Sequence, residues 1–386
     1  MAAPATDLGD VAVVDNHCHA VLRDQGQRDV TAWRGLFTES PDPRTRAVDV
    51  ASTVFYQRLV TEMALFHDVD PVEEVVLDAR AALGAERLTA DLLGDARLGG
   101  LVVDTGFPDA ATALTVEDMG RSGGCPAVGL LRLEPEFERL VGETGSYPAL
   151  VDAVRALVAD ARGDGWAGFK SVVGYRTGLA VARWSDDAAR TAWAEARAEA
   201  TSAGSVRLGH QPLLDTLLHL AFAAAAAQEL PVQLHVGYGD PDLDLRLADP
   251  LLLRPVLEEP AYRGMPVVLL HGCWPYVREG AFLAAVYGNA WLDLSYGIPF
   301  LSRGEMRRVT RAALGTAPAS RLMYSSDGAR VPELHRMGAH DGRRLLGEAL
   351  DELVADGDLT PDQAQLTGER VLKDNAWSLY GFGAAR

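Results

Sequence analysis

The sequence predicts a single α/β domain, a (β/α)8 barrel of the TIM type, and three observations support this fold class. Eight short apolar runs rich in β-branched residues recur along the chain, and helix-like stretches separate most of them. The runs are almost continuously apolar, which is typical of parallel strands covered on both faces. Eight such units favour a closed barrel over an open sheet, and 386 residues is an ordinary length for one.

The expected strands follow one another in chain order. They are 11–16, 100–104, 127–133, 167–173, 231–236, 266–271, 290–295 and 321–326. Helical patterns fill most of the intervals, at 46–66, 71–94, 147–162, 212–229, 250–260, 275–288 and 303–315. The stretch 212–229 is the clearest of these because leucine and alanine dominate it. Pro231 follows it directly and marks its end before the next strand.

Two long segments interrupt the alternation of strand and helix. Residues 20–99 separate the first two strands, and residues 174–230 separate the fourth and fifth. Insertions at the carboxyl ends of barrel strands cap the active face. We therefore expect helical insertions after the first and fourth strands, both of them lid candidates, with 20–99 the longer. Residues 341–386 are expected to form a C-terminal helical tail, and the absence of a low-complexity linker predicts one domain over 1–386.

Composition narrows the class of protein. The net charge of −18 argues against nucleic acids and anionic membranes, both of which attract basic surfaces. No apolar run reaches the length of about 18 residues that a transmembrane helix needs. The three cysteines, Cys18, Cys125 and Cys273, are few and far apart, which fits a reducing cytoplasm. We expect a small-molecule substrate as partner, and a homo-oligomer is left open because barrels often pair through their outer helices.

The segment VVDNHCHA, residues 13–20, carries the strongest chemical signal. A short apolar run ends in His17, Cys18 and His19. Side chains alternate along a strand, so the two histidines are expected on one face and Cys18 on the other. Two imidazoles on one face at the end of a buried strand can bind one divalent metal.

Later strands end in residues that can complete such a site. These residues are Lys170 on the fourth strand, His235 at the end of the fifth, His271 at the end of the sixth and Asp327 after the eighth. A barrel brings all the carboxyl ends of its strands to one rim. Imidazole and carboxylate together indicate zinc first, with manganese, iron and nickel as alternatives.

The order of these residues resembles the amidohydrolase superfamily. The segments GFKSVVGYRTGL, LPVQLHVGYGD and DNAWSLYGF are similar to its amidohydrolase-related branch, which includes the hydrolase-like domain fused to glutamine synthetase-like proteins. The resemblance extends from His17 to Phe382. It implies that His17, His19 and His235 hold a metal and that Asp327 contacts both the metal and the attacking water.

The resemblance also implies a reaction, the hydrolysis of an amide or related C–N bond by a metal-activated water. A bound metal can lower the pKa of its water from about 15.7 toward 7. Asp327 would carry the proton to the leaving group. His271 would either assist catalysis, by stabilising the oxyanion, or bind a second metal. Lys170 would either be carbamylated between two metals or remain an ammonium group that pairs with a substrate carboxylate.

Five further residues are candidates for substrate binding. They are Arg132 at the end of the third strand, Tyr175 and Arg176 after the fourth, Trp274 after the sixth and Tyr296 after the seventh. An arginine in this region could bind a carboxylate through two hydrogen bonds. The sequence therefore predicts a small, carboxylate-bearing metabolite as substrate.

Two alternatives to hydrolysis are left open. Related barrels use a similar metal set for nonhydrolytic decarboxylation of aromatic or enoic acids, and these relatives usually lack a lysine like Lys170. The second alternative is a catalytically silent barrel that binds a ligand. Its signature would be a missing metal ligand, and the sequence lacks none of the expected residues.

Overall fold

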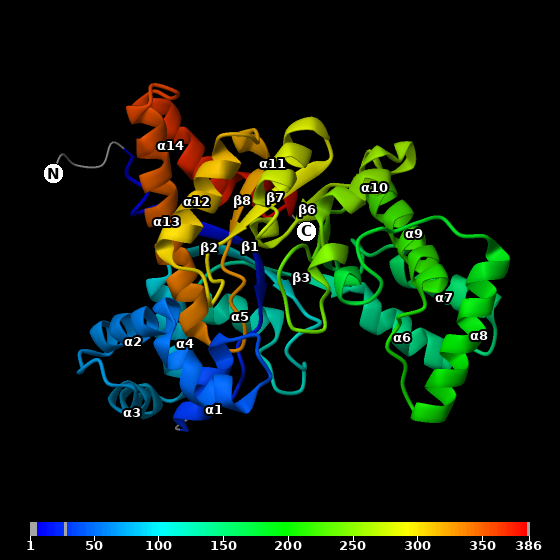
Figure 1. Ribbon diagram of the computed structural model, residues 1–386, viewed down its shortest axis with the longest axis horizontal. Coiled ribbons are helices and arrows are strands. Elements are labelled where there is room, and N and C mark those ends of the chain that lie inside the picture. Colours follow the sequence, from blue (N-terminus) through cyan, green and yellow to red (C-terminus); the bar gives the residue numbers. More distant parts are fainter. Residues whose placement is uncertain (1–5, 27–28, 384–386) are drawn as a thin grey trace.

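The computed structural model, which describes residues 6–26 and 29–383, is an eight-stranded parallel barrel surrounded by helices (Figure 1). The strands pair in chain order from β1 to β8. They are β1 (Val13–His19), β2 (Leu98–Asp104), β3 (Ala127–Arg132), β4 (Trp166–Ser171), β5 (Val232–Leu234), β6 (Val267–Leu269), β7 (Ala290–Ser295) and β8 (Leu322–Ser325). The backbone N–H of Asp327 donates to the oxygen of His17 (3.1 Å), which joins the chain after β8 to β1. The predicted (β/α)8 barrel is confirmed.

Helices cover the outside of the barrel. In the described residues the α-helices are α1 (Val30–Arg34), α2 (Val54–His67), α3 (Glu73–Leu83), α4 (Ala85–Asp95), α5 (Val116–Gly123), α6 (Leu133–Glu143), α7 (Tyr147–Val158), α8 (Asp186–Ala203), α9 (Gln211–Gln228), α10 (Arg254–Glu258), α11 (Val277–Val286), α12 (Arg303–Leu314), α13 (Pro332–Ala355), α14 (Pro361–Glu369) and α15 (Asn375–Leu379). Over these same residues, no helix combines the length and the apolar character needed to cross a bilayer.

Apolar side chains fill one end of the barrel interior. Val14, Val102 and Met323 belong to an apolar cluster inside the strands, and Ala376 and Tyr380 from the last part of the chain join it. All five side chains are buried. Because α15 and the residue after it close this end, the carboxyl ends of the strands form the end at which a site can open.

The segment between β1 and β2 folds around its own small core. Figure 1 shows α1–α4 gathered on one side of the barrel, with α6–α9 on the opposite side. Trp33 and Phe37 are buried in this core together with residues of α2–α4 and the start of α13. A buried ion pair between Arg80 and Glu333, 2.6 Å long, ties the segment to α13. This packing fixes residues 35–46, which reach the cavity described below.

The segment between β4 and β5 consists mainly of α8 and α9, which pack on each other. Ser185 caps α8 by accepting a hydrogen bond from the N–H of Ala188, and a stripe of buried alanines faces inward. At the C-terminus, α13 runs unbroken from Pro332 to Ala355, so the helical tail expected from residue 341 begins inside a longer helix.

Candidate metal centre

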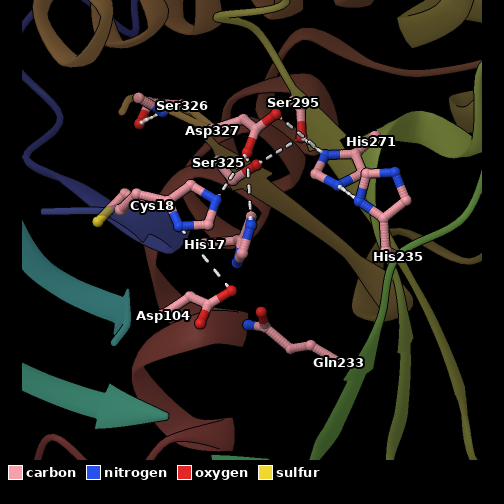
Figure 2. A network of polar contacts seen from close by, with 12 residues as sticks. His17, Cys18, Asp104, Gln233, His235, His271, Ser295, Ser325, Ser326 and Asp327 are labelled. Atoms are coloured by element: carbon pink, nitrogen blue, oxygen red, sulfur yellow. Dashed lines mark hydrogen bonds and ion pairs between the residues drawn. The ribbon is translucent and has the colours of Figure 1, made fainter. Parts of the chain in front are cut away.

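The predicted metal-binding residues lie at the carboxyl ends of the strands. His17 and His19 belong to the end of β1, Lys170 to the end of β4, and His235, His271 and Asp327 follow β5, β6 and β8. Figure 2 shows Asp327 between the rings of His17 and His271. The barrel thus brings together side chains that are about three hundred positions apart in the sequence.

Toward its carboxyl end β1 carries one extra residue relative to its neighbour β2, which offsets an extra residue of β2 opposite Val13 and Val14. Between Asp15 and Cys18, three steps along β1 match two steps along β2. A bulge of this kind changes the direction in which the neighbouring side chains point. His17 and His19 both face the centre. The Cys18 thiol points into the outer core, where its Sγ lies 3.6 Å from the backbone oxygen of Val102.

His17, His19 and Asp327 form a compact group of ligand atoms. Oδ1 of Asp327 lies 3.4 Å from Nε2 of His17 and 3.7 Å from Nε2 of His19. The three ligand atoms all lie within 4.8 Å of one another. Burial lowers the pKa of both imidazoles, that of His19 to about 3, so both rings are neutral and can bind a metal. The donor set and its neutral imidazoles therefore fit a divalent ion.

Lys170 lies beside this group and is buried. Its Nζ is 3.3 Å from Nε2 of His17 and 3.9 Å from Oδ2 of Asp104. Burial lowers the pKa of the Lys170 amine to about 8, against the opposing effect of the Asp104 carboxylate. A substantial fraction of the amine is therefore neutral near pH 8, which is the form that can react or bind a metal.

Asp104, at the end of β2, is a site residue that the sequence analysis missed. Burial alone would raise the pKa of its carboxyl group, but the positive charges of Arg132 and Lys170 and the hydrogen bonds from Arg132 reverse the effect and lower the pKa far below its usual range. Arg132 binds Asp104 through two nitrogens, with an Nη2–Oδ2 distance of 2.5 Å. The signal was available, because Asp104 ends an apolar strand as the predicted ligands do.

His271 and His235 are linked to each other and to Asp327. Nδ1 of His271 lies 3.3 Å from Oδ2 of Asp327, and its Nε2 lies 2.9 Å from Nδ1 of His235. The remaining nitrogen of His235 contacts the backbone oxygen of Tyr238 at 2.6 Å. Both ring nitrogens of His235 thus have protein partners, and His235 lies outside the group formed by His17, His19 and Asp327.

Tyr238 is a second residue that the sequence analysis missed. Its hydroxyl donates to Oδ2 of Asp327 at 2.7 Å. Burial raises the pKa of this phenol well above its usual value, so it remains a hydrogen-bond donor. Tyr238 belongs to the short glycine-containing turn after β5, where the sequence pattern indicates only a turn.

A buried carboxylate on β7 holds His271 in position. Asp293 accepts hydrogen bonds from the backbone N–H of His271 (2.8 Å) and from the hydroxyl of Ser295 (2.6 Å) through one oxygen. Its other oxygen accepts from the side chain of Asn16 (2.6 Å). Burial raises the pKa of Asp293 to about 6. These contacts fix the ring of His271 toward Asp327.

A cavity of about 700 Å³ opens above the group. Its walls include His19, Lys170, His235, His271 and Asp327. Residues from the segment after β1, among them Glu39 and Arg46, form another part of the wall. The volume is in the range of small-molecule sites.

Three of the predicted substrate-binding residues line this cavity, and all three are already engaged. Arg176 lines the cavity, and its Nε donates to Glu138 at 3.1 Å. The ring of Tyr175 lies 4.6 Å from the ring of His235, and its hydroxyl accepts a hydrogen bond from the N–H of Asp240 (3.3 Å). Arg132 also lines the cavity while paired as described above.

Tyr296 and Trp274, two further predicted substrate-binding residues, lie behind the wall of the cavity. Tyr296 is the residue after the inward-facing Ser295, so alternation turns it outward; it is buried and bonded to Thr310 at 2.9 Å. Trp274 follows a turn in which Gly272 has a φ of 57°, and its ring packs behind Tyr238 at 6.4 Å. Neither residue is among those that line the cavity.

Fold and site together define a (β/α)8 barrel protein with imidazole and carboxylate ligands grouped at the carboxyl rim of its strands. The family described as amidohydrolase matches residues 14–382. The chain belongs to this amidohydrolase family, as the order of the strand-end residues indicated.

The chain is similar to several known proteins. It is 37% identical over 233 residues to Protein fluG of Emericella nidulans, which covers 58% of this chain and 27% of that protein. The chain thus spans about a quarter of the length of this relative. A Lactobacillus casei structure, provisionally described as a metal-dependent hydrolase, aligns with a TM-score of 0.85 at 27% identity over 98% of both chains.

Two isomerase structures share the fold at lower identity. Uronate isomerase of Thermotoga maritima has a TM-score of 0.70 at 13% identity and covers 96% of this chain and 95% of its own. Glucuronate isomerase of Caulobacter crescentus has a TM-score of 0.66 at 16% identity, with 98% and 92% covered. At these identities the likeness concerns the fold alone.

Proposed function

We propose that this chain is a metal-dependent hydrolase that cleaves an amide or related C–N bond in a small, carboxylate-bearing metabolite. The observation that carries the proposal is the division of roles between the two oxygens of Asp327. Oδ1 faces His17 and His19, whereas Oδ2 accepts a hydrogen bond from Tyr238 and lies beside His271. A carboxylate arranged in this way can contact a metal with one oxygen and a reacting water with the other.

The donor set supports a first divalent ion on His17, His19 and Asp327, with zinc as the first choice, and a carbamylated Lys170 would allow a second. His235, His271 and Lys170 are the further candidate ligands in this proposal. Few protein ligands and a cavity above them are typical of catalytic sites, which keep a coordination position open. When bound, the ion supplies the Lewis acidity that makes hydroxide available near neutral pH. Manganese, iron and nickel accept the same donors.

The chain's own side chains would handle the proton. Oδ2 of Asp327 is the atom that takes the proton from the attacking water and returns it to the leaving nitrogen. Tyr238 fixes the orientation of that oxygen through its hydrogen bond. Burial keeps the pKa of His271 well below its usual value, so this ring is neutral, and its one N–H, at Nε2, is donated to Nδ1 of His235. His271 would therefore assist through Nδ1, which lies 3.3 Å from Oδ2 of Asp327 and can accept a hydrogen bond from that oxygen once it holds the proton.

Decarboxylation is the second candidate reaction, and Lys170 bears on the choice. Decarboxylase-like relatives usually lack a lysine on this strand, whereas here the amine contacts His17 directly. A bridging role for Lys170 therefore favours hydrolysis. A catalytically silent barrel is disfavoured because His17, His19 and Asp327 keep their donor atoms together.

A cytoplasmic location belongs to the same proposal. The three cysteines are free, and unpaired thiols are typical of a reducing compartment.

The test compares amine release with carbon dioxide release. Zinc-loaded protein is incubated with a panel of N-acyl amino acids and ω-amides of dicarboxylic acids, and we expect amine release. Asp327→Asn should lower kcat by about 10²- to 10⁴-fold. Asp244→Asn, a half-buried acid that pairs with Arg246 outside the group, is the matched control. Carbon dioxide release without amine release would reject hydrolysis in favour of decarboxylation.

A further inference from the structure

Several arginines line the cavity above the proposed metal site. They are Arg46, Arg132, Arg176, Arg207 and Arg330. Three of them are held in ion pairs, Arg132 by Asp104, Arg176 by Glu138 and Arg207 by Asp242. Arg46 donates through Nε to the backbone oxygen of Ser40 at 2.9 Å. Arg330 differs from these, because its buried Nε has no hydrogen-bond partner among residues 6–26 and 29–383.

The backbone holds Arg330 in a conformation that most residues avoid. Its φ is 66°, in the left-handed region, where a side chain larger than hydrogen is strained. Its N–H donates to the oxygen of Ala20 (3.1 Å), and its own oxygen accepts from the N–H of Leu22 (2.9 Å). These two bonds hold the backbone of Arg330, which lies three positions after Asp327, against the segment that follows β1. Strain of this kind clusters at ligand sites, and Arg330 carries it at the wall of the cavity.

An aromatic ring connects Arg330 to the proposed metal ligands. The guanidinium carbon lies 5.4 Å from the centroid of the Phe107 ring. The same ring meets the edge of the His19 ring at 5.4 Å. Arg330 and His19 therefore lie on one wall of the cavity with a single ring between them. A short ligand can therefore reach from the Arg330 guanidinium to a metal bound by His19.

Two acids lie near Arg330 without neutralising it. Glu39 and Asp240 both act on its charge, although neither forms an ion pair with it. Burial and the neighbouring Asp240 raise the pKa of Glu39 to about 8, so Glu39 is protonated at neutral pH. Asp242 is paired with Arg207, whereas the carboxylate of Asp240 also lines the cavity and would repel a dianion such as phosphate more strongly than a monoanion. A singly charged carboxylate suits this environment better.

We infer that Arg330 is the anchor for a substrate carboxylate, and that Arg132 and Arg176 are wall residues held by their own ion pairs. The inference rests on the proposed function for the position of the reacting carbonyl beside Asp327. A guanidinium binds a carboxylate through two parallel hydrogen bonds. The substrate class is then a small acid whose carboxylate is joined by a short chain to the scissile amide.

A series of hydroxamates tests the anchor, because every compound binds the metal through the same hydroxamate group and only the end of the tail differs. Zinc-loaded protein is titrated calorimetrically with hydroxamates that carry a short methylene tail ending in a carboxylate, an amide or a methyl group. At the best tail length, the carboxylate form should bind the wild type about tenfold or more tightly than the amide form. Arg330→Gln should abolish this preference, and Arg330→Lys should keep part of it.

The matched control is Arg207→Gln, which removes an ion-paired arginine from the same cavity and should keep the preference. Unchanged binding of the methyl-tailed hydroxamate to Arg330→Gln checks that this variant folds. Equal preference in wild type and Arg330→Gln would reject the anchor while leaving the metal site intact. A phosphonate tail that binds better than the carboxylate tail would overturn the ligand class. If no hydroxamate binds the wild type, the proposed metal site fails and the anchor fails with it.

Discussion

Nζ of Lys170 lies 3.3 Å from Nε2 of His17, and both atoms are buried beside Asp327. At this separation, a neutral lysine amine and an imidazole nitrogen can both be ligands of the same cation. The lowered pKa of Lys170, about 8, makes the neutral amine accessible near neutral pH. The pair therefore links the number of bound metals to the chemical state of Lys170.

The first prediction is that wild-type protein binds two metal equivalents per chain and Lys170→Met binds one. A carbamylated lysine would bridge two ions, and methionine cannot replace it. The measurement is inductively coupled plasma mass spectrometry on protein purified without added metal or chelator. One equivalent in both proteins would instead leave Lys170 as an amine and reopen decarboxylation. No metal even after reconstitution with zinc or manganese would reject the metal centre.

The second prediction concerns the histidines of β1. His17→Ala and His19→Ala should each lose most of the bound metal, because each removes one of three grouped donors. Metal content is measured beside circular dichroism to show that the barrel is retained. His340→Gln, a histidine on the surface of α13, serves as the control and should keep its metal. Full occupancy in both alanine variants would reject the ligand assignment.

The strands could be predicted because apolar runs define them. The expected strand 290–295 coincides with β7 (Ala290–Ser295). β1 continues beyond the expected 11–16 to His19 because its polar residues find buried partners, such as Asn16 with Asp293. An apolar run alone cannot indicate such partners, which come from strands far along the chain.

Helices were predicted less well where proline divides them. The expected helix over 250–260 is three short pieces, 250–253, α10 and 260–262. Pro255 and Pro260 each lie in the first turn of a new piece, since proline suits the first turn of a helix and not its interior. Likewise, the expected helix over 46–66 is regular only from Val54 onward.

Tertiary contacts also limited what could be predicted of the candidate site. Position at a strand end predicted His17, His19 and Asp327, whose ligand atoms the structure groups together. The same pattern could not tell which arginine is held in an ion pair. The partners of Arg132 and Arg176 lie 28 and 38 positions away. Such pairs depend on tertiary contacts that residue spacing does not encode.

The third prediction concerns the pair of buried Asp104 and partly buried Arg132. Asp104→Asn should lower the free energy of unfolding by about 1–3 kcal/mol, because it leaves the Arg132 guanidinium without its anion at the cavity wall. Urea unfolding measures the change. In a double-mutant cycle, Asp104→Asn combined with Arg132→Met should recover part of the loss. Additive losses would show that the two side chains stabilise the barrel independently.

The fourth prediction is that His335 makes the fold sensitive to acid. His335 lies in the first part of α13, fully buried, and neither ring nitrogen has a hydrogen-bond partner in the described part of the chain. Burial lowers its pKa to about 4, whereas an exposed histidine has a pKa near 6.5. Its neighbour Asp15 has a pKa raised by burial to about 7, so at acid pH Asp15 is neutral and offers no charge to a protonated ring.

The sign of the effect follows from proton binding in the two states. Between pH 6.5 and 4 the unfolded chain carries a proton on His335 and the folded chain does not, so stability falls as the pH falls through this window. Wild type should therefore lose about 3 kcal/mol more than His335→Gln between pH 7 and pH 4. Urea unfolding of chelator-treated proteins measures this without a contribution from metal release. His340→Gln, on the exposed side of the same helix, should follow the wild type. If the curves for wild type and His335→Gln run parallel, His335 is not the source of the acid sensitivity.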